Sequence, residues 1–188
     1  TDLPLDAQRR SRHAAGQMVF RQGDPVVGVF AVVSGAVALR RSTADGQALS
    51  VHNAVSGELF AEASLFTPTY HCDARCNRDS DLIQISKAAM LDAIAHQPAF
   101  ALAWSQHLAI TVQRARQRIE LLAVADARER VRAAVALGLL DSPVTEFAAR
   151  IGLHQATCYR ALSALVHAGV LVRHGRGRYA TAPGQPPS

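Results

Sequence analysis

The sequence predicts an α+β fold: an antiparallel β-roll, or jelly roll, in the N-terminal half, then one long helix, then a C-terminal winged helix-turn-helix. Three observations support this prediction. Short apolar runs separated by glycine-containing turns fill the first half of the chain, and a helical period of apolar residues begins near Lys87. Two short helix patterns and two short strand patterns then end the chain. The corresponding domains are predicted over 1–97, 98–125 and 126–188.

The strands of the first half are predicted from their turn signals. Apolar runs over 18–20, 29–33, 36–39, 48–55 and 81–85 are separated by Gly23-Asp24-Pro25, Ser34-Gly35, Asp45-Gly46 and Gly57-Glu58. An Asp-Gly pair favours a two-residue hairpin turn, because both turn residues need a positive φ. Many short strands with glycine-rich turns are typical of a small antiparallel barrel or jelly roll.

Two helices are predicted after the strands, over 87–96 and from Pro98 to about Ala125, because proline ends the first and can begin the second. Apolar residues of the longer helix recur at alternating spacings of four and three, which is the seam of a coiled coil. The seam consists of Leu108, Val112, Ala115, Ile119 and Leu122. This pattern predicts a homodimer through the long helix. Packing of the helix on the chain's own β-roll is the alternative.

A break at Asp126 separates the long helix from a further one. Asp126 can cap a helix that is expected to run to about Leu140, with Glu129 three residues later as in a capping box. We therefore expect the hinge between the domains at Asp126.

Two further helix patterns, over 146–151 and 155–167, are separated by Gly152, which can supply a left-handed turn. Thr145 is expected to cap the first, and the small Ala148 allows the two helices to approach. The apolar positions predict an interior made of Phe147, Ile151, Leu153, Cys158, Ala161, Leu162 and Leu165. We expect Cys158 to pack in this core rather than to act as a redox sensor.

Two strand patterns over 170–173 and 179–181 then flank a basic, glycine-rich tip, as in the wing of a winged helix. Residues 145–188 hold five arginines against one glutamate, whereas residues 1–97 hold nine basic and ten acidic residues. A basic end on a neutral body indicates a polyanion as the partner at that end. Together with the winged helix pattern, it predicts double-stranded DNA. The expected DNA contacts are Thr145, His154, Gln155, Thr157, Tyr159, Arg160, Arg176 and Arg178. A solvated basic tail and a helical hairpin without DNA function are the alternatives.

Other classes of protein are excluded by composition and by missing motifs. Mean hydropathy of +0.06 argues against disorder, and no apolar run is long enough for a membrane-spanning helix. No signal-peptide pattern opens the chain and the three cysteines form no disulfide framework, so we expect a cytoplasmic protein without a membrane partner. No nucleophile elbow, P-loop or HExxH motif is present, so an enzyme is not expected.

Three motifs give the chain a family resemblance. They are Gly16-x-x-Val-Phe-x-x-Gly-Asp24, Phe30-x-Val-x-Ser-Gly35-x-Val37, and Gly57-Glu-Leu-Phe-Ala-Glu-Ala-Ser-Leu-Phe66. With the long helix, the Asp126 junction and the helix-turn-helix after them, residues 15–181 resemble the cyclic-AMP receptor protein and fumarate–nitrate reductase regulator (Crp/Fnr) superfamily. The segments 60–63 and 67–70 are most similar to regulators of dissimilatory nitrate respiration. The resemblance implies a homodimeric bacterial transcription regulator with a cyclic-nucleotide-binding-like sensory β-roll, a palindromic operator and RNA polymerase as a partner.

The resemblance also places an effector pocket around Glu58, Glu62, His71, Cys72, Asp73, Ala115 and Arg116. Cyclic-nucleotide-binding members have an Arg-Ser pair near the cyclic phosphate, whereas this chain has Tyr70-His71-Cys72-Asp73, and the Asp73 carboxylate would repel a phosphate. Glu62 matches the family's ribose-contacting glutamate, but Ala61 replaces the glycine beside it. Ala115 and Arg116 stand where hydroxyl groups contact adenine. We therefore expect an effector other than cyclic AMP, of unknown identity.

A haem- or metal-dependent gas or redox sensor is an alternative, because His71, Cys72 and Cys76 are soft ligands in the region where effectors bind. Two reduced cysteines and a surface histidine are the simpler interpretation, since in a strand His71 and Asp73 would face away from both cysteines. An iron–sulfur cluster is not expected, because members that bind one need four cysteines and this chain has three.

The family's DNA-reading triplet corresponds to Ala156, Tyr159 and Arg160. Ala156 replaces the usual glutamate, which accepts a hydrogen bond from cytosine, so the operator is expected to differ from the family consensus. A module that binds an effector and acts mainly through protein contacts, with a degenerate DNA-binding domain, is the alternative from another class.

Overall fold

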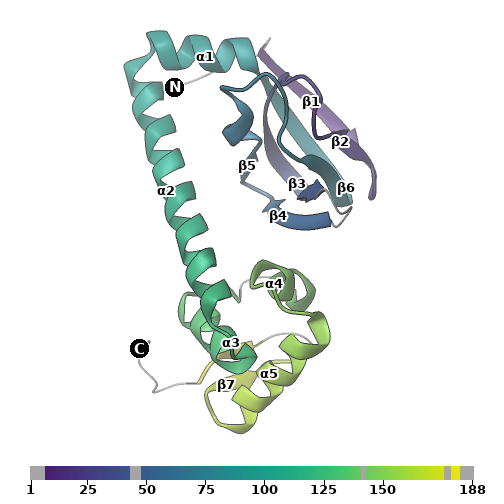
Figure 1. The fold of residues 1–188 in the computed structure, drawn as a ribbon, viewed down its shortest axis with the longest axis vertical. Helices are drawn as coiled ribbons and strands as arrows, with labels where there is room; N and C mark the ends of the chain where they lie inside the picture. Colours follow the sequence, from purple (N-terminus) through teal and green to yellow (C-terminus); the bar gives the residue numbers. More distant parts are fainter. Residues whose placement is uncertain (1–6, 43–47, 141–142, 176–178, 183–188) are drawn as a thin grey trace. The chain divides into compact units, whose positions relative to one another are not determined.

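The computed structural model describes residues 7–42, 48–140, 143–175 and 179–182. The chain forms two compact units, the first ending at His107 and the second beginning at Leu108 (Figure 1). Each unit has a hydrophobic core of its own. Among the described residues, no helix is both long enough and apolar enough to cross a membrane.

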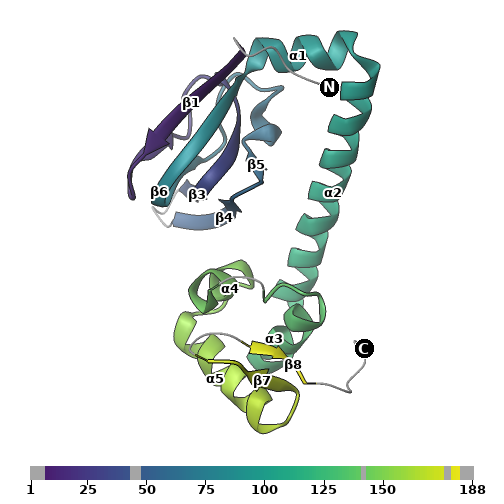
Figure 2. The same ribbon diagram turned by 180° about the vertical axis from the view of Figure 1, so that it is seen from behind.

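The first unit is built on an antiparallel sheet, as predicted. Its strands are β1 (Gln8–His13), β2 (Met18–Phe20), β3 (Gly28–Ser42), β4 (Ala48–Val55), β5 (Leu59–Phe60) and β6 (Asp73–Ser86). The strand order is β1-β6-β3-β4 (Figure 2). Strand β2 pairs with β6, and β5 pairs with β3. The Asp45-Gly46 turn lies outside the described residues, although β3 and β4 on either side of it pair antiparallel.

The prediction of two separate strands around Ser34-Gly35 is wrong, because β3 continues through them as one strand with register shifts against β6. Gly35 has a φ of +98°, and a Cβ there would overlap the Ser80 hydroxyl. The buried Ser80 Oγ accepts a hydrogen bond from Ala36 N at 3.1 Å. Glycine is therefore needed for a close approach to β6 and not for a turn between strands.

Aromatic side chains fill the interior of the sheet. Tyr70, which is 2% exposed, stacks on Phe20 with a ring-centroid distance of 3.7 Å, and Phe30 stacks on Phe60 at 5.1 Å. The Tyr70 hydroxyl donates to Gly28 O at 2.9 Å. Its polar tip is thus satisfied by the backbone of β3, which allows the ring to remain in the core.

The helices α1 (Lys87–His96) and α2 (Pro98–Ala123) follow the sheet. Ser86 caps α1 by accepting from Ala89 N at 3.2 Å. Proline opens α2 as predicted, and the helix ends two residues before the predicted Ala125. A short 3-10 turn, η2 (Glu62–Ser64), lies between β5 and β6.

The second unit contains α3 (Ala127–Ala136), α4 (Val144–Arg150), α5 (Gln155–His167), β7 (Leu171–Arg173) and β8 (Tyr179–Thr181). Asp126 caps α3 as predicted, with Oδ1 accepting from Glu129 N at 2.9 Å. The helix does not reach the predicted Leu140, because Gly138 takes a φ of +70° shortly after its end.

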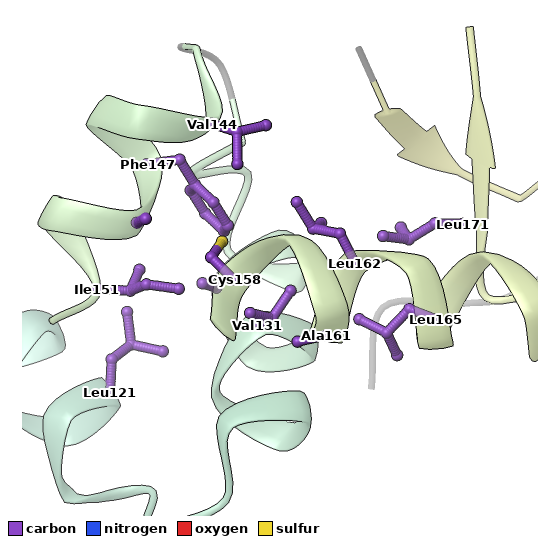
Figure 3. Close-up of a cluster of buried hydrophobic side chains, with 12 residues drawn as sticks. Leu121, Val131, Val144, Phe147, Ile151, Cys158, Ala161, Leu162, Leu165 and Leu171 are labelled. Carbon is purple, nitrogen blue, oxygen red and sulfur yellow. The ribbon is translucent and has the colours of Figure 1, made fainter. Parts of the chain in front are cut away.

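One apolar core joins these helices to the end of α2 (Figure 3). Its members are Leu121, Val131, Ala134, Val144, Phe147, Ala148, Ile151, Cys158, Ala161, Leu162, Leu165 and Leu171. Because Leu121 belongs to α2, the C-terminal half of that helix packs as part of the second unit.

Candidate nucleic-acid interface and effector region

Helices α4 and α5 are joined by a tight turn at Gly152, whose φ is +66°. Gly152 N donates to Ala149 O at 3.3 Å and Leu153 N donates to Ala148 O at 2.9 Å. These two bonds form a Schellman motif, which satisfies carbonyls at the end of α4 and reverses the chain direction. The predicted helix-turn-helix geometry at Gly152 is therefore present.

One face of α5 is fixed in the core. Cys158, Leu162 and Leu165 are almost completely buried, and Ala148 on α4 is 1% exposed, so the small residue does allow the close approach predicted. Burial raises the pKa of the Cys158 thiol to about 11. A thiol that stays protonated is a poor nucleophile, which supports the packing interpretation of Cys158.

The other face of α5 carries the predicted contact residues. The exposed positions are His154, Gln155, Ala156, Tyr159 and Arg160, and Thr157 is half-buried beside them. Arg160 Nη2 donates to Thr157 Oγ1 at 3.3 Å, so the hydroxyl one turn earlier orients the guanidinium. His154 is the N-cap residue, and the first turn of an α-helix leaves its N–H groups free for an anion.

The other predicted DNA contacts, Thr145, Arg176 and Arg178, do not lie on α5. Thr145 does not cap α4, because Pro143 is the N-cap residue; Thr145 is an exposed residue of the helix itself. Arg176 and Arg178 lie outside the described residues. The strands that flank them, β7 and β8, pair antiparallel, with Arg173 opposite Tyr179.

In the first unit, the two predicted effector-pocket glutamates each lie near a histidine. Glu58 Oε2 accepts from Val55 N at 3.1 Å and lies 3.6 Å from His52 Nε2. Glu62, on η2, lies 3.6 Å from His107 Nε2 of α2, and its side chain is only 15% exposed. His107 is not predictable as a neighbour of Glu62, because no motif or periodicity links α2 to η2.

Within the segment 71–76, the strand β6 begins only at Asp73, and His71 and Cys72 precede it in a bend. Cys76 is buried in the aromatic core and Cys72 packs against the same core, whereas His71 is exposed. Asp73 Oδ1 accepts from Gln22 N at 2.8 Å. The structure thus separates His71 from the two thiols and, across the described residues, forms no cluster of three or more metal-ligating side chains.

Burial also raises the pKa of the Cys72 thiol, with Arg41 acting in the opposite direction, and burial raises the pKa of the Cys76 thiol. Both thiols are therefore protonated while no metal is bound. Among the described residues, His71, Cys72 and Cys76 do not form one group of three metal-ligating side chains.

The predicted seam on α2 is largely uncovered. Val112, Ile119 and Leu122 are 49%, 67% and 41% exposed, Ala115 is also exposed and Leu108 is half-buried. Ala115 and Arg116 belong to the second unit, whereas the other predicted effector residues belong to the first.

Comparisons with known proteins agree with this architecture. Residues 10–97 match the cyclic nucleotide-binding domain family. The chain is 32% identical over 184 residues to the cyclic AMP receptor protein of Thermus thermophilus, covering 94% of this chain and 85% of that protein. Among solved structures, it resembles FixK2 from Bradyrhizobium japonicum with a TM-score of 0.75 at 20% identity, covering 93% and 92% of the two chains. It also resembles a transcriptional regulator of the CRP/FNR family from Thermus thermophilus, with a TM-score of 0.63 at 23% identity and 92% and 93% coverage.

Proposed function

The chain belongs to the Crp/Fnr superfamily of transcription regulators, and on this premise we propose that it is a homodimer that binds a palindromic operator in double-stranded DNA. Its relatives are transcription regulators and not enzymes, so the chain is not an enzyme. The observation that carries the proposal is the outward face of α5. There Arg160 is exposed, and its guanidinium donates a hydrogen bond to Thr157. The opposite face of the same helix is buried in the core.

Arg160 and the polar residues around it have different roles in this proposal. A guanidinium can form two hydrogen bonds with guanine O6 and N7, which distinguishes that base pair in the major groove. His154, Gln155 and Thr157 at the start of α5 and Thr145 on α4 are suited to phosphate contacts, which position the protein without reading sequence. Arg176 and Arg178 would add phosphate contacts from the tip between β7 and β8, which then acts as the wing.

Dimerisation through α2 is supported by the uncovered seam. A monomer would leave Val112, Ile119 and Leu122 in water, whereas a second copy of α2 would cover all three. A dimer also presents two copies of α5, which matches the symmetry of a palindromic operator.

We propose that an effector other than cyclic AMP acts on the β-roll. Asp73 and the half-buried Cys72 occupy the segment where a cyclic phosphate would need a cation and a donor, and a buried phosphate without a cation is costly. Glu62 lies 3.6 Å from His107 Nε2, so a histidine side chain stands beside the carboxylate that would contact a ribose. The separation of His71 from Cys72 and Cys76 argues against the haem or metal alternative. RNA polymerase is proposed as a further partner because of the family role.

Selection from a pool of random DNA duplexes tests the proposed function. We expect the wild-type chain to enrich one palindrome whose half-sites repeat about one helical turn, near 34 Å, apart. Enrichment of no sequence, with binding only to a protein partner, would favour the effector-binding module with a degenerate DNA-binding domain.

A further inference from the structure

One guanidinium spans the junction between α2 and the helix-turn-helix. Arg130 Nε donates to Val124 O at 2.8 Å, and Arg130 Nη2 donates to Leu122 O at 3.3 Å. On its other side, Arg130 Nη1 donates to Ile151 O at 3.3 Å and to Gly152 O at 3.4 Å. A single side chain of α3 therefore contacts the end of α2 and the turn that precedes α5.

The chemistry of these four acceptors explains the choice of arginine. Leu122 lies in the last turn of α2 and Val124 just after it, whereas Ile151 is the C-cap residue of α4 and Gly152 follows it. Carbonyls at a helix C-terminus lack intrahelical partners and carry partial negative charge. Arginine presents five donors in a planar fork, whereas lysine presents three donors on one nitrogen.

Apolar contacts hold the same junction together. A Cβ at Gly152 would overlap Leu122 Cδ2, so the turn already lies against the last turn of α2. Leu121 of α2 and Ile151 of α4 are buried in one core. The guanidinium thus fixes the direction of two elements that are already in contact.

We propose that Arg130 is a positioning residue that sets the angle between α2 and the recognition helix α5. This inference rests on the proposed function, because α2 is the proposed dimer helix and α5 the proposed DNA-reading helix. In a dimer, that angle determines the separation of the two recognition helices and hence the spacing of the half-sites. Arg130 then contributes to operator choice through the spacing of the half-sites without touching a base.

The test uses the full-length chain with Arg130→Lys, which keeps the charge and removes the fork, and Arg130→Gln, which keeps two donors and removes the charge. Arg128→Lys, on the exposed face of the same helix, is the matched control. Binding is measured to the selected palindrome, to the same palindrome with one base pair inserted between the half-sites, and to a single half-site. One base pair moves the half-sites by about 3.4 Å along the axis.

We expect Arg130→Lys to reduce the preference for the correct spacing by about tenfold, since three or more charge-assisted hydrogen bonds lose their geometry. Binding to the single half-site should change by less than about twofold, because α5 itself is intact. Arg128→Lys should retain the wild-type preference. A uniform loss on all three probes, or an unchanged preference in both Arg130 variants, would overturn the positioning role.

Amide hydrogen exchange provides a readout that does not depend on DNA. In Arg130→Lys and Arg130→Gln we expect the amides of Val124 and Leu153 to exchange faster, while Leu162 in the centre of α5 keeps its protection. Equal acceleration at all three amides would indicate general destabilisation and overturn the proposal. Failure of the wild-type chain to select any palindrome would instead contradict the proposed function, and the exchange result would remain interpretable.

Discussion

Substitution of Ile119 by aspartate should separate the proposed dimer into monomers. Ile119 is 67% exposed in the single chain and lies in the seam of α2. Burying an isoleucine side chain contributes about 1.5–3 kcal/mol, so burying two thirds of it in each chain of a dimer contributes about 2–4 kcal/mol. The aspartate would also bury two unpaired carboxylates, which costs several kcal/mol more. A total above about 4 kcal/mol weakens the dimer more than a thousandfold.

Sedimentation equilibrium at micromolar concentration measures this change, with Ile110→Asp as the matched control. Ile110 is 52% exposed and lies nine residues before Ile119, which places it on the opposite face of α2 because nine residues make two and a half turns. We expect a monomer for Ile119→Asp and a dimer for Ile110→Asp. A dimeric Ile119→Asp with a lowered melting temperature would refute the reasoning and favour packing of α2 on its own chain.

Four further predictions concern Ala61, the effector and Cys158. Among the described residues, Ala61 is the non-glycine residue with a positive φ, at +70°. Because glycine adopts this conformation without strain, Ala61→Gly should raise the free energy of unfolding, measured by urea denaturation, by about 0.5–1 kcal/mol. A loss of stability would contradict this. Titration calorimetry with millimolar cyclic AMP should show no binding, and a low-micromolar Kd would refute the proposal on the effector. Burial raises the pKa of the Cys158 thiol to about 11, so at pH 8 the rate of its alkylation should be limited by the rate of unfolding. Rapid labelling of Cys158 in the native chain would contradict its buried placement. Since the same thiol ionises near pH 9 once unfolded, its contribution to stability should be complete below pH 9 and should disappear as the pH rises through 11.

Local signals in the sequence were sufficient for the existence of the helices and for some of their ends, but not for the start of α4 or the end of α3. Proline at 98, the Asp126 cap and the left-handed Gly152 each act over three or four residues, and each produced the predicted structure. The two faces of α5 were also predictable, because helical periodicity alone separates Cys158 and Leu162 from the exposed positions.

Features that depend on distant neighbours were not predictable. Strand β1 consists of polar and basic residues and shows no apolar alternation, so the sequence gives no strand signal there. The strand is held by backbone pairing with β6 and by Asp81 of β6, which lies within 3.3 Å of both Arg10 and Arg12. Tyr70 appeared to belong to an effector segment, yet its ring packs in the core because Phe20 and the β3 backbone meet it there. Arg130 gave no signal at all, since its four acceptors are carbonyls, which every residue type supplies.

Whether α5 reads the operator is tested by the DNA-binding specificity of Arg160→Ala compared with that of Arg176→Ala. Binding isotherms are recorded on the selected palindrome and on duplexes with mutated half-sites, at several salt concentrations. Arg160→Ala should remove the discrimination of a bidentate guanine pair, about 1–3 kcal/mol per half-site. Arg176→Ala should weaken all duplexes similarly and reduce the salt slope by about 0.9 for each phosphate that the protein no longer neutralises. If Arg160→Ala retains full discrimination between the palindrome and its mutants, α5 is not the helix that reads the operator.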